Sequence, residues 1–383
     1  MNSAKRALWG LSCGHFILDM YAAILIPLYP IIAQRLQINL AEISLVIAIG
    51  FSVSSILQPV FGYVSDKLQK RFFMFWGLIF AAVFVPLGYF APNSAILTLC
   101  LILGMAGNAF YHPQVTLIIK NFYEENIALS RAIGIFLGLG TIGYSIAPYL
   151  SGFIIEKFGS YFIYTGLIGI ITAFILLFFV PKIEKKEQKS ASNFYLALKE
   201  IVKNQACVFL ILLTILKACL VMSFSTYIPF LLKNYGFTIS QTGFIMTSFF
   251  ISGALAMIFA SNLEKRIKLK GMIIASYLPL LPLVICVMLL LHYSKVLAVI
   301  FLILIGFFVL LAAGSILAHS QKLIPNNTGT ISGIIQGFTL AIGSLLLIPL
   351  GFIGQKYGLH FALILITSIA AISALYTYKT KLI

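Results

Sequence analysis

The most constraining feature of this sequence is a succession of apolar runs, each about 20 residues long, with short polar loops between them. A helix of that length crosses the hydrocarbon core of a bilayer. Because lipid offers the backbone no hydrogen-bond partner, each run must bond internally, which predicts α-helices. Asn39 and Ser240 are expected to begin two of them. Twelve transmembrane helices are predicted, near residues 8–33, 42–66, 72–91, 95–119, 130–154, 160–180, 205–232, 240–262, 271–291, 296–321, 329–354 and 360–378.

The composition excludes a soluble domain. Of 383 residues, 61% are hydrophobic and 9% are charged, and the mean hydropathy is +1.05. A soluble domain carries about 25% charged residues, so this chain could not cover its apolar surface in water. The net charge of +16 does not indicate nucleic-acid binding, because the basic residues are scattered between apolar runs. We therefore expect an all-α integral protein of the lipid bilayer.

The charges of the loops orient the predicted helices. With the N-terminus in the cytoplasm, 20 lysines and arginines fall on the inner side and five on the outer side. Cytoplasmic loops of membrane proteins carry such an excess. One further basic residue, Lys217, lies inside a predicted span. The chain is expected to cross a bacterial cytoplasmic (inner) membrane many times, with both termini in the cytoplasm.

The two halves of the chain repeat each other. Segment 152–159 returns 199 residues later as 351–358, with glycine at both ends of each copy, and Pro27 matches Pro229 at an offset of 202. Internal repeats of this kind are typical of transporter folds. A charged stretch separates the halves. We expect two pseudo-symmetric six-helix bundles over 1–181 and 205–383, joined by a cytoplasmic linker over 182–204.

The loop between the second and third predicted spans reads Gly-Tyr-Val-Ser-Asp-Lys-Leu-Gln-Lys-Arg at 62–71. It resembles the signature loop of the major facilitator superfamily, with Gln69 in place of the second glycine. The resemblance implies that this loop locks the cytoplasmic side of the bundle as the protein changes conformation. The residues that match the signature are Gly62, Asp66, Lys67 and Arg71, and the second copy of the motif contains Glu264 and Lys265.

Within that superfamily the chain resembles the fosmidomycin resistance proteins. The matching segments include Ser-Cys-Gly-His-Phe-Ile-Leu-Asp at 12–19, Phe-Tyr-His-Pro-Gln at 110–114 and Gln-Lys-Leu-Ile-Pro at 321–325. This resemblance covers nearly the whole chain and implies drug efflux by proton antiport. Where that family often has a glutamate after His-Pro, this chain has Gln114, so one protonatable group is missing.

Asp19 is the one acidic residue, of ten, that lies deep in a predicted span. A charge at the bilayer centre costs about 2.5–3.5 kcal/mol on insertion scales, so a residue of this kind indicates a function. His15 precedes it by four residues and therefore lies on the same helix face. Two such groups can titrate as one unit, and we expect Asp19 and His15 to carry the coupled proton. A structural hydrogen bond between helices is the alternative for Asp19.

Other polar residues within spans are candidates for substrate binding or coupling. With His15, the residues His112, Lys217 and His319 place one titratable group in the first helix of each three-helix repeat. The superfamily resemblance implies that these four helices line a central cavity. Lys217 is expected either to pair with Asp19 or to attract an anionic substrate. Further candidates, chosen for their hydrogen-bonding groups, are Asn108, Gln336, Tyr21 and Tyr227.

The sequence predicts neither an enzyme nor a cofactor site. The histidines and Asp19 lack metal-ligand spacing, the five cysteines are scattered, and no nucleophile motif or phosphate loop occurs. We expect no metal, no cofactor and no nucleic acid, and a monomer that handles protons and a small organic compound. The expected function is proton-coupled export by alternating access. A metabolite uptake symporter or facilitator is the alternative, and a non-transporting membrane sensor is the alternative of another class.

Overall fold

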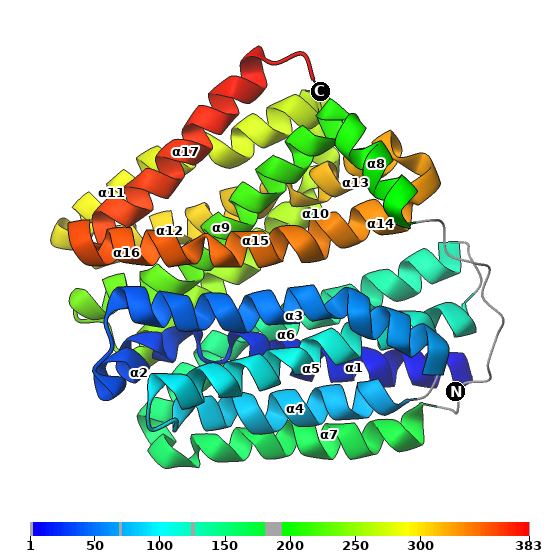
Figure 1. Cartoon of the computed structure of the whole chain (residues 1–383). Helices are drawn as coiled ribbons and strands as arrows, with labels where there is room; N and C mark the ends of the chain where they lie inside the picture. The colour runs from blue at the N-terminus through cyan, green and yellow to red at the C-terminus, as the bar shows by residue number, and fades with distance from the viewer. Residues whose placement is uncertain (1–2, 69–70, 124–126, 181–193, 383) are drawn as a thin grey trace. The chain divides into compact units, whose positions relative to one another are not determined.

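The computed structural model describes residues 3–68, 71–123, 127–180 and 194–382. These residues form helices joined by short turns, and no strand occurs among them (Figure 1). The all-α fold expected from the apolar runs is therefore confirmed.

The elements follow one another along the chain with few residues between them. The first half contains α1 (Ser3–Ala23), η1 (Ile26–Leu28), α2 (Tyr29–Leu36), α3 (Leu40–Leu68), α4 (Phe72–Tyr89), α5 (Ser94–Phe122), α6 (Ile127–Phe158), η2 (Gly159–Tyr164) and α7 (Thr165–Phe179). The short helix α8 (Phe194–Lys203) comes next. The second half contains α9 (Gln205–Asn234), α10 (Ile239–Tyr277), α11 (Leu280–Tyr293), α12 (Lys295–Leu311), α13 (Ala313–Leu323), η3 (Pro325–Asn327), α14 (Thr328–Gly333), η4 (Ile334–Phe338), α15 (Thr339–Leu345), α16 (Leu347–Tyr357) and α17 (Leu359–Lys379).

Ten helical runs among the described residues are long and apolar enough to cross a membrane. Two of them, Arg131–Phe179 with 49 residues and Ile239–Tyr293 with 55, are too long for one crossing. At about 1.5 Å per residue the shorter of them would measure about 74 Å, more than twice the hydrocarbon core of a bilayer. Each holds two of the predicted spans, so the twelve-helix arrangement accounts for all ten runs.

The backbone breaks within these two runs where the second crossing begins. Gly159 has φ +53° at the start of η2, a left-handed conformation that glycine adopts without steric cost. Lys268 has φ 56° and interrupts α10 between its two crossings. The expected boundaries between these spans therefore coincide with real turns of the chain.

Side chains at the helix starts satisfy free backbone N–H groups. Asn39 and Glu42 form a capping box before α3, in which Oδ1 of Asn39 accepts from the Glu42 N–H at 3.0 Å and Oε2 of Glu42 accepts from the Asn39 N–H at 2.7 Å. The start expected at Ser240 is wrong by two residues, because Oγ1 of Thr238 accepts from the Gln241 N–H at 3.2 Å and α10 begins at Ile239.

The chain divides into two compact units. The first unit contains Met1–Ile38, Val46–Gln188 and Phe237–Thr247, and the second contains Asn39–Leu45, Lys189–Gly236 and Ser248–Ile383. This division differs from the predicted halves at two short segments, 39–45 and 237–247, which begin α3 and α10. The predicted linker 182–204 lies outside the described residues up to 193, and its remainder forms α8.

Candidate functional site

The pair predicted on the first helix lies in the interior of the first unit. Nε2 of His15 is 3.0 Å from Oδ2 of Asp19, one turn further along α1. The His15 side chain is 3% exposed and that of Asp19 is 18% exposed, so the imidazole is enclosed and the carboxylate is partly accessible. The contact is an ion pair by distance, although Nε2 forms no aligned hydrogen bond.

A second imidazole reaches the same carboxylate from α5. Nε2 of His112 is 3.5 Å from Oδ1 of Asp19, and the ring centroids of His15 and His112 are 4.8 Å apart at an interplanar angle of 88°. The His112 side chain is 26% exposed. The carboxylate thus lies between two imidazoles from two helices, one closed off and one open to water.

The orientation of the His15 ring is set by α6. Nδ1 of His15 lies 2.8 Å from the carbonyl oxygen of Phe136, and the two rings stack at 4.0 Å between centroids. Gly140, one turn further along α6, leaves the space that the imidazole occupies, since a methyl group there would overlap the ring. Three helices therefore contribute to the site: α1, α5 and α6.

The Phe136 contact assigns the protons of the His15 ring. A carbonyl oxygen only accepts hydrogen bonds, so Nδ1 must carry a proton in every charge state of the ring. Nε2 is then the nitrogen that titrates, and it faces Oδ2 of Asp19. Two titratable groups this close to each other can titrate as one coupled unit.

Three buried side-chain atoms among the described residues form no aligned hydrogen bond: Oγ of Ser12, Nε2 of His15 and Oδ1 of Asn108. Nε2 of His15 faces the Asp19 carboxylate, so Oγ of Ser12 and Oδ1 of Asn108 are the two without a polar partner. Asn108 precedes His112 by one turn of α5, as Ser12 precedes His15 by three residues of α1. Buried polar groups are nearly always bonded, so such orphans mark a place for water or a ligand. The sequence predicted a role for Asn108 and missed Ser12, whose type is common inside helices.

Gln114, which follows His112 and Pro113 in α5, caps a neighbouring helix. Its Oε1 accepts from the backbone N–H of Met74, in the first turn of α4. The first four N–H groups of a helix lack partners within it, and a neutral amide oxygen supplies one without introducing a charge. Gln114 is 1% exposed and ties α5 to α4.

In the second unit, Glu264 and His319 also lie together. Oε1 of Glu264 is 3.4 Å from Nδ1 of His319, and Oε2 accepts from the Ser315 hydroxyl at 2.6 Å. Nδ1 of His319 also lies 3.0 Å from the Ser315 carbonyl oxygen. Ser315 precedes His319 by one turn of α13, as Asn108 precedes His112. Each unit thus brings a histidine and an acid together, with different polar neighbours.

The signature-loop residues are described in part. Gly62, Asp66 and Lys67 belong to the last turns of α3, and their side chains lie outside the described residues. Arg71 donates to the carbonyl oxygens of Leu177, at 2.6 Å, and Val180. These carbonyls end α7, where a cation stabilises the helix dipole. In the second copy, Lys265 is exposed and lies 3.5 Å from Oδ1 of Asn262.

The remaining candidates differ in how their polar groups are used. The Tyr21 hydroxyl is buried, donating to the Thr165 carbonyl at 2.7 Å and accepting from the Gly169 N–H at 3.0 Å. The hydroxyl of buried Tyr227 lies 3.3 Å from the Leu347 carbonyl oxygen. Both hydroxyl groups thus contact the backbone of a neighbouring helix, and a role of these tyrosines in substrate binding stays a prediction. Gln336 is exposed, and Lys217 is half-buried with no ion-pair partner among the described residues of its own unit.

His15, Asp19 and His112 could also hold a metal ion. Each offers one ligand atom, and these three atoms lie within 4.8 Å of one another. No metal was expected, because these residues are not spaced along the sequence as metal ligands usually are. The packing of α1 against α5 nevertheless brings them together. The expectation itself stays a prediction.

Comparison with known proteins gives the family. The Major Facilitator Superfamily matches residues 11–348, and the chain belongs to this family of transporters. It is 25% identical to the fosmidomycin resistance protein of Escherichia coli (strain K12), over 91% of this chain and 86% of that protein. It is also 25% identical to "Probable nitrate transporter NarT" of Staphylococcus epidermidis, over 56% of this chain and 54% of that protein.

Solved structures share the fold at low sequence identity. The nucleoside transporter NupG matches with a TM-score of 0.78 at 15% identity over 100% of both chains. A bacterial homologue of the human lysosomal transporter Spinster matches with a TM-score of 0.75 at 14% identity, over 99% of this chain and 97% of that one. Membership of the superfamily confirms that the chain is a multi-pass membrane transporter and not an enzyme.

Proposed function

We propose that this transporter is coupled to protons and exports a small organic compound by antiport. The observation that carries the proposal is the 3.0 Å contact between Nε2 of His15 and Oδ2 of Asp19, with Nδ1 of His15 directed at the Phe136 carbonyl. Asp19 is the proton carrier, because its carboxylate is the partly exposed member of the pair. His112 senses the charge of Asp19 from α5.

A proton on Asp19 changes the contact between α1 and α5. While the carboxylate is ionised, it attracts the Nε2 side of both imidazoles when they are protonated. Once it is neutral, that attraction is lost and the two helices separate more easily. Alternating access requires two arrangements of similar free energy, and this charge change shifts the balance between them. Inward movement of a proton releases about 2.3 kcal/mol per 100 mV, which can drive export of a small solute.

The proposed substrate is organic and could carry a negative charge. Lys217 in α9 supplies a positive charge within a span, whereas Asp19 is the acidic residue deep in one. Asn108 and Ser12 supply buried polar atoms that lack protein partners. The likeness to a fosmidomycin resistance protein supports export of a drug-like compound. We place the protein in a bacterial cytoplasmic membrane, with both termini inside, because of the loop charges.

Uptake of an anion by symport is the second candidate, and one observation favours it. A relative named as a nitrate transporter matches a little over half of the chain. A metabolite symporter would use the same His15–Asp19 pair with the opposite direction of substrate movement.

The direction of proton movement separates these candidates. Proteoliposomes loaded with a probe compound and a pH-sensitive dye are diluted into probe-free medium, with fosmidomycin and nitrate as the two probes. As the probe leaves, antiport acidifies the lumen, symport makes it alkaline, and a facilitator leaves it unchanged. Lumen acidification with fosmidomycin is the expected result. Alkalinisation would show symport, and efflux without a pH change would overturn proton coupling.

A further inference from the structure

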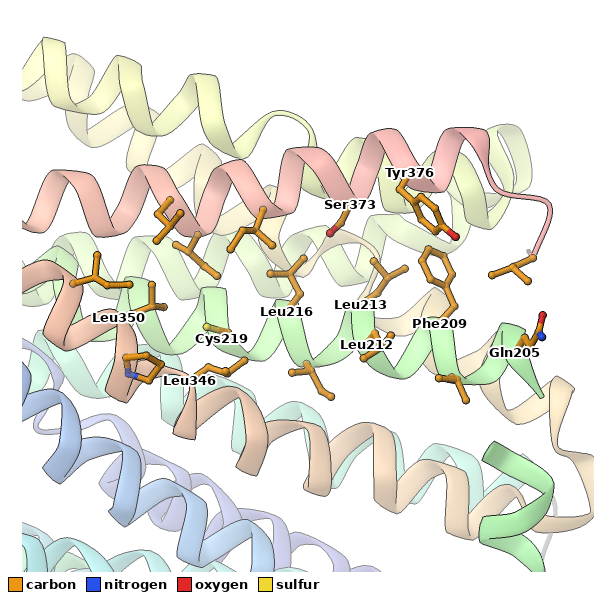
Figure 2. Close-up of a pocket in the computed structure, with 18 of the residues that line it drawn as sticks. Gln205, Phe209, Leu212, Leu213, Leu216, Cys219, Leu346, Leu350, Ser373 and Tyr376 are labelled. Carbon is orange, nitrogen blue, oxygen red and sulfur yellow. The ribbon is translucent and has the colours of Figure 1, made fainter. Parts of the chain in front are cut away.

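The second unit has an apolar groove. Its volume is about 840 Å³, and it lies between α9, α16 and α17 (Figure 2). Its lining is almost entirely aliphatic and aromatic, with polar groups from Gln205, Ser373 and Tyr376. Several lining side chains are open to the outside, including Leu212 at 57% and Ile369 at 43% exposed. The groove is therefore accessible from the lipid.

The internal repeat explains why the groove is open. In the first unit, α7 packs directly on α1 at Gly10 and Gly14, where an added methyl group would meet Leu176 and Phe179. At the offset of 202 residues that relates Pro27 to Pro229, these glycines correspond to Leu212 and Leu216. Both leucines line the groove. Small residues allow helices to approach closely in a membrane, and branched side chains hold α17 away from α9.

The groove has the dimensions of a lipid tail. It follows α9 from Gln205 to Cys219, which corresponds to about 21 Å at 1.5 Å per residue. One leaflet of the hydrocarbon core is about 15 Å thick, so an extended acyl chain spans most of this length. An unfilled groove would forfeit the dispersion contacts of its lining.

One end of the groove is basic. Val202 and Leu382 line that end, where the rings of Phe209 and Tyr376 lie 5.7 Å apart. Lys203, which follows Val202, and Lys381, which precedes Leu382, are both exposed. Lys379 at the end of α17 is exposed as well. Nζ of Lys270 donates to the Thr380 carbonyl at 2.5 Å and holds this end of the chain in place. Glu200, the acidic residue nearest to Lys203 in the sequence, accepts a hydrogen bond from Asn327.

We propose that this groove binds an anionic membrane phospholipid, with one acyl chain along α9 and the headgroup phosphate at Lys203, Lys379 and Lys381. The acyl chain packs against α9 in the second unit, as α7 packs against α1 in the first unit. The lysines supply the selectivity, because each basic residue near an anionic headgroup favours it by a factor of about five. This site is separate from the His15–Asp19 pair and does not depend on the proposed coupling.

Quenching of a single tryptophan by brominated lipid tests the proposal. In a Trp9→Phe, Trp76→Phe background, Leu212→Trp places a reporter in the groove, and Ile171→Trp places a control reporter on exposed α7. Each variant is reconstituted in phosphatidylcholine vesicles that contain one minor brominated lipid, either phosphatidylglycerol or phosphatidylcholine. The groove reporter is expected to be quenched severalfold more effectively by the anionic lipid, and the control reporter equally by both.

A second experiment removes the positive charges of the three lysines at the basic end of the groove. Lys203→Gln, Lys379→Gln and Lys381→Gln combined should remove the anionic preference at Leu212→Trp and leave quenching by phosphatidylcholine unchanged. Unchanged transport by the triple variant confirms that it is folded. Equal quenching by both lipids with the native lysines, or a preference that survives their removal, would overturn the site. A reporter that neither lipid quenches would show that no acyl chain enters the groove.

Discussion

Nδ1 of His15 lies 2.8 Å from the carbonyl oxygen of Phe136, and this contact decides which nitrogen of His15 faces Asp19. The carbonyl fixes a proton on Nδ1 and leaves Nε2 to exchange its proton with the carboxylate 3.0 Å away. An imidazole free to flip could offer either nitrogen and would hold Asp19 less well. The backbone of α6 thus orients the imidazole of a pair whose two members both come from α1.

Gly140→Ala tests the space that α6 leaves for the imidazole. The added methyl group would overlap the His15 ring and displace it from the Phe136 carbonyl. We expect the probe-driven pH change in proteoliposomes to fall by about 100-fold, as for misplacement of a reacting group by about 1 Å. Gly138→Ala is the matched control on the same helix, because nothing lies within 4 Å of its added carbon. Equal rates for the two variants would contradict the role of the ring position.

Two substitutions of Gln114 test whether this position provides a hydrogen-bond acceptor or a site for a charge. Gln114→Glu keeps an oxygen for the Met74 N–H but buries an ionisable carboxyl group, so thermal stability should fall without any gain in proton flux. Gln114→Leu leaves that buried N–H without a partner and should lower the free energy of unfolding by about 1–3 kcal/mol, measured by denaturation in detergent. Strong activation of proton flux by Gln114→Glu would contradict the capping assignment.

Arg71 is expected to stabilise the end of α7. Arg71→Ala removes charge-assisted hydrogen bonds to the carbonyls of Leu177 and Val180, each worth about 1.5–3 kcal/mol when buried and less here, since the contacts are partly exposed. Thermal unfolding in detergent should occur several degrees lower than for the wild-type protein. Arg266→Ala, at an exposed position of α10, is the control and should leave the midpoint unchanged. A midpoint unaffected by Arg71→Ala would refute the capping role.

Features that depend on neighbours along the chain were predictable from the sequence. The twelve spans follow from apolar length, and the His15–Asp19 contact follows from a four-residue spacing on one helix. The capping box at Asn39 and Glu42 is equally local. Such features depend on helical geometry, which the residue spacing determines.

Features that depend on how helices pack were not predictable. Nothing in the spacing of His112 places it 3.5 Å from Asp19, because the rotation of α5 against α1 is set by many side chains. For the same reason the sequence did not show that the Tyr21 hydroxyl bonds to the backbone of α7, and its role toward a substrate stays a prediction. The use of Gln114 as a cap for α4 likewise depends on the approach of α5.

The most direct test of the central claim is Asp19→Asn in proteoliposomes, compared with the wild-type protein. The amide cannot carry the coupled proton, yet it keeps the shape of the side chain and its ability to form hydrogen bonds. Wild-type vesicles loaded with fosmidomycin should acidify as the probe leaves. The variant should show no pH change while still exchanging labelled for unlabelled probe at equal concentrations, which requires only conformational cycling. Acidification by Asp19→Asn at the wild-type rate would contradict the assignment of Asp19 as the proton carrier.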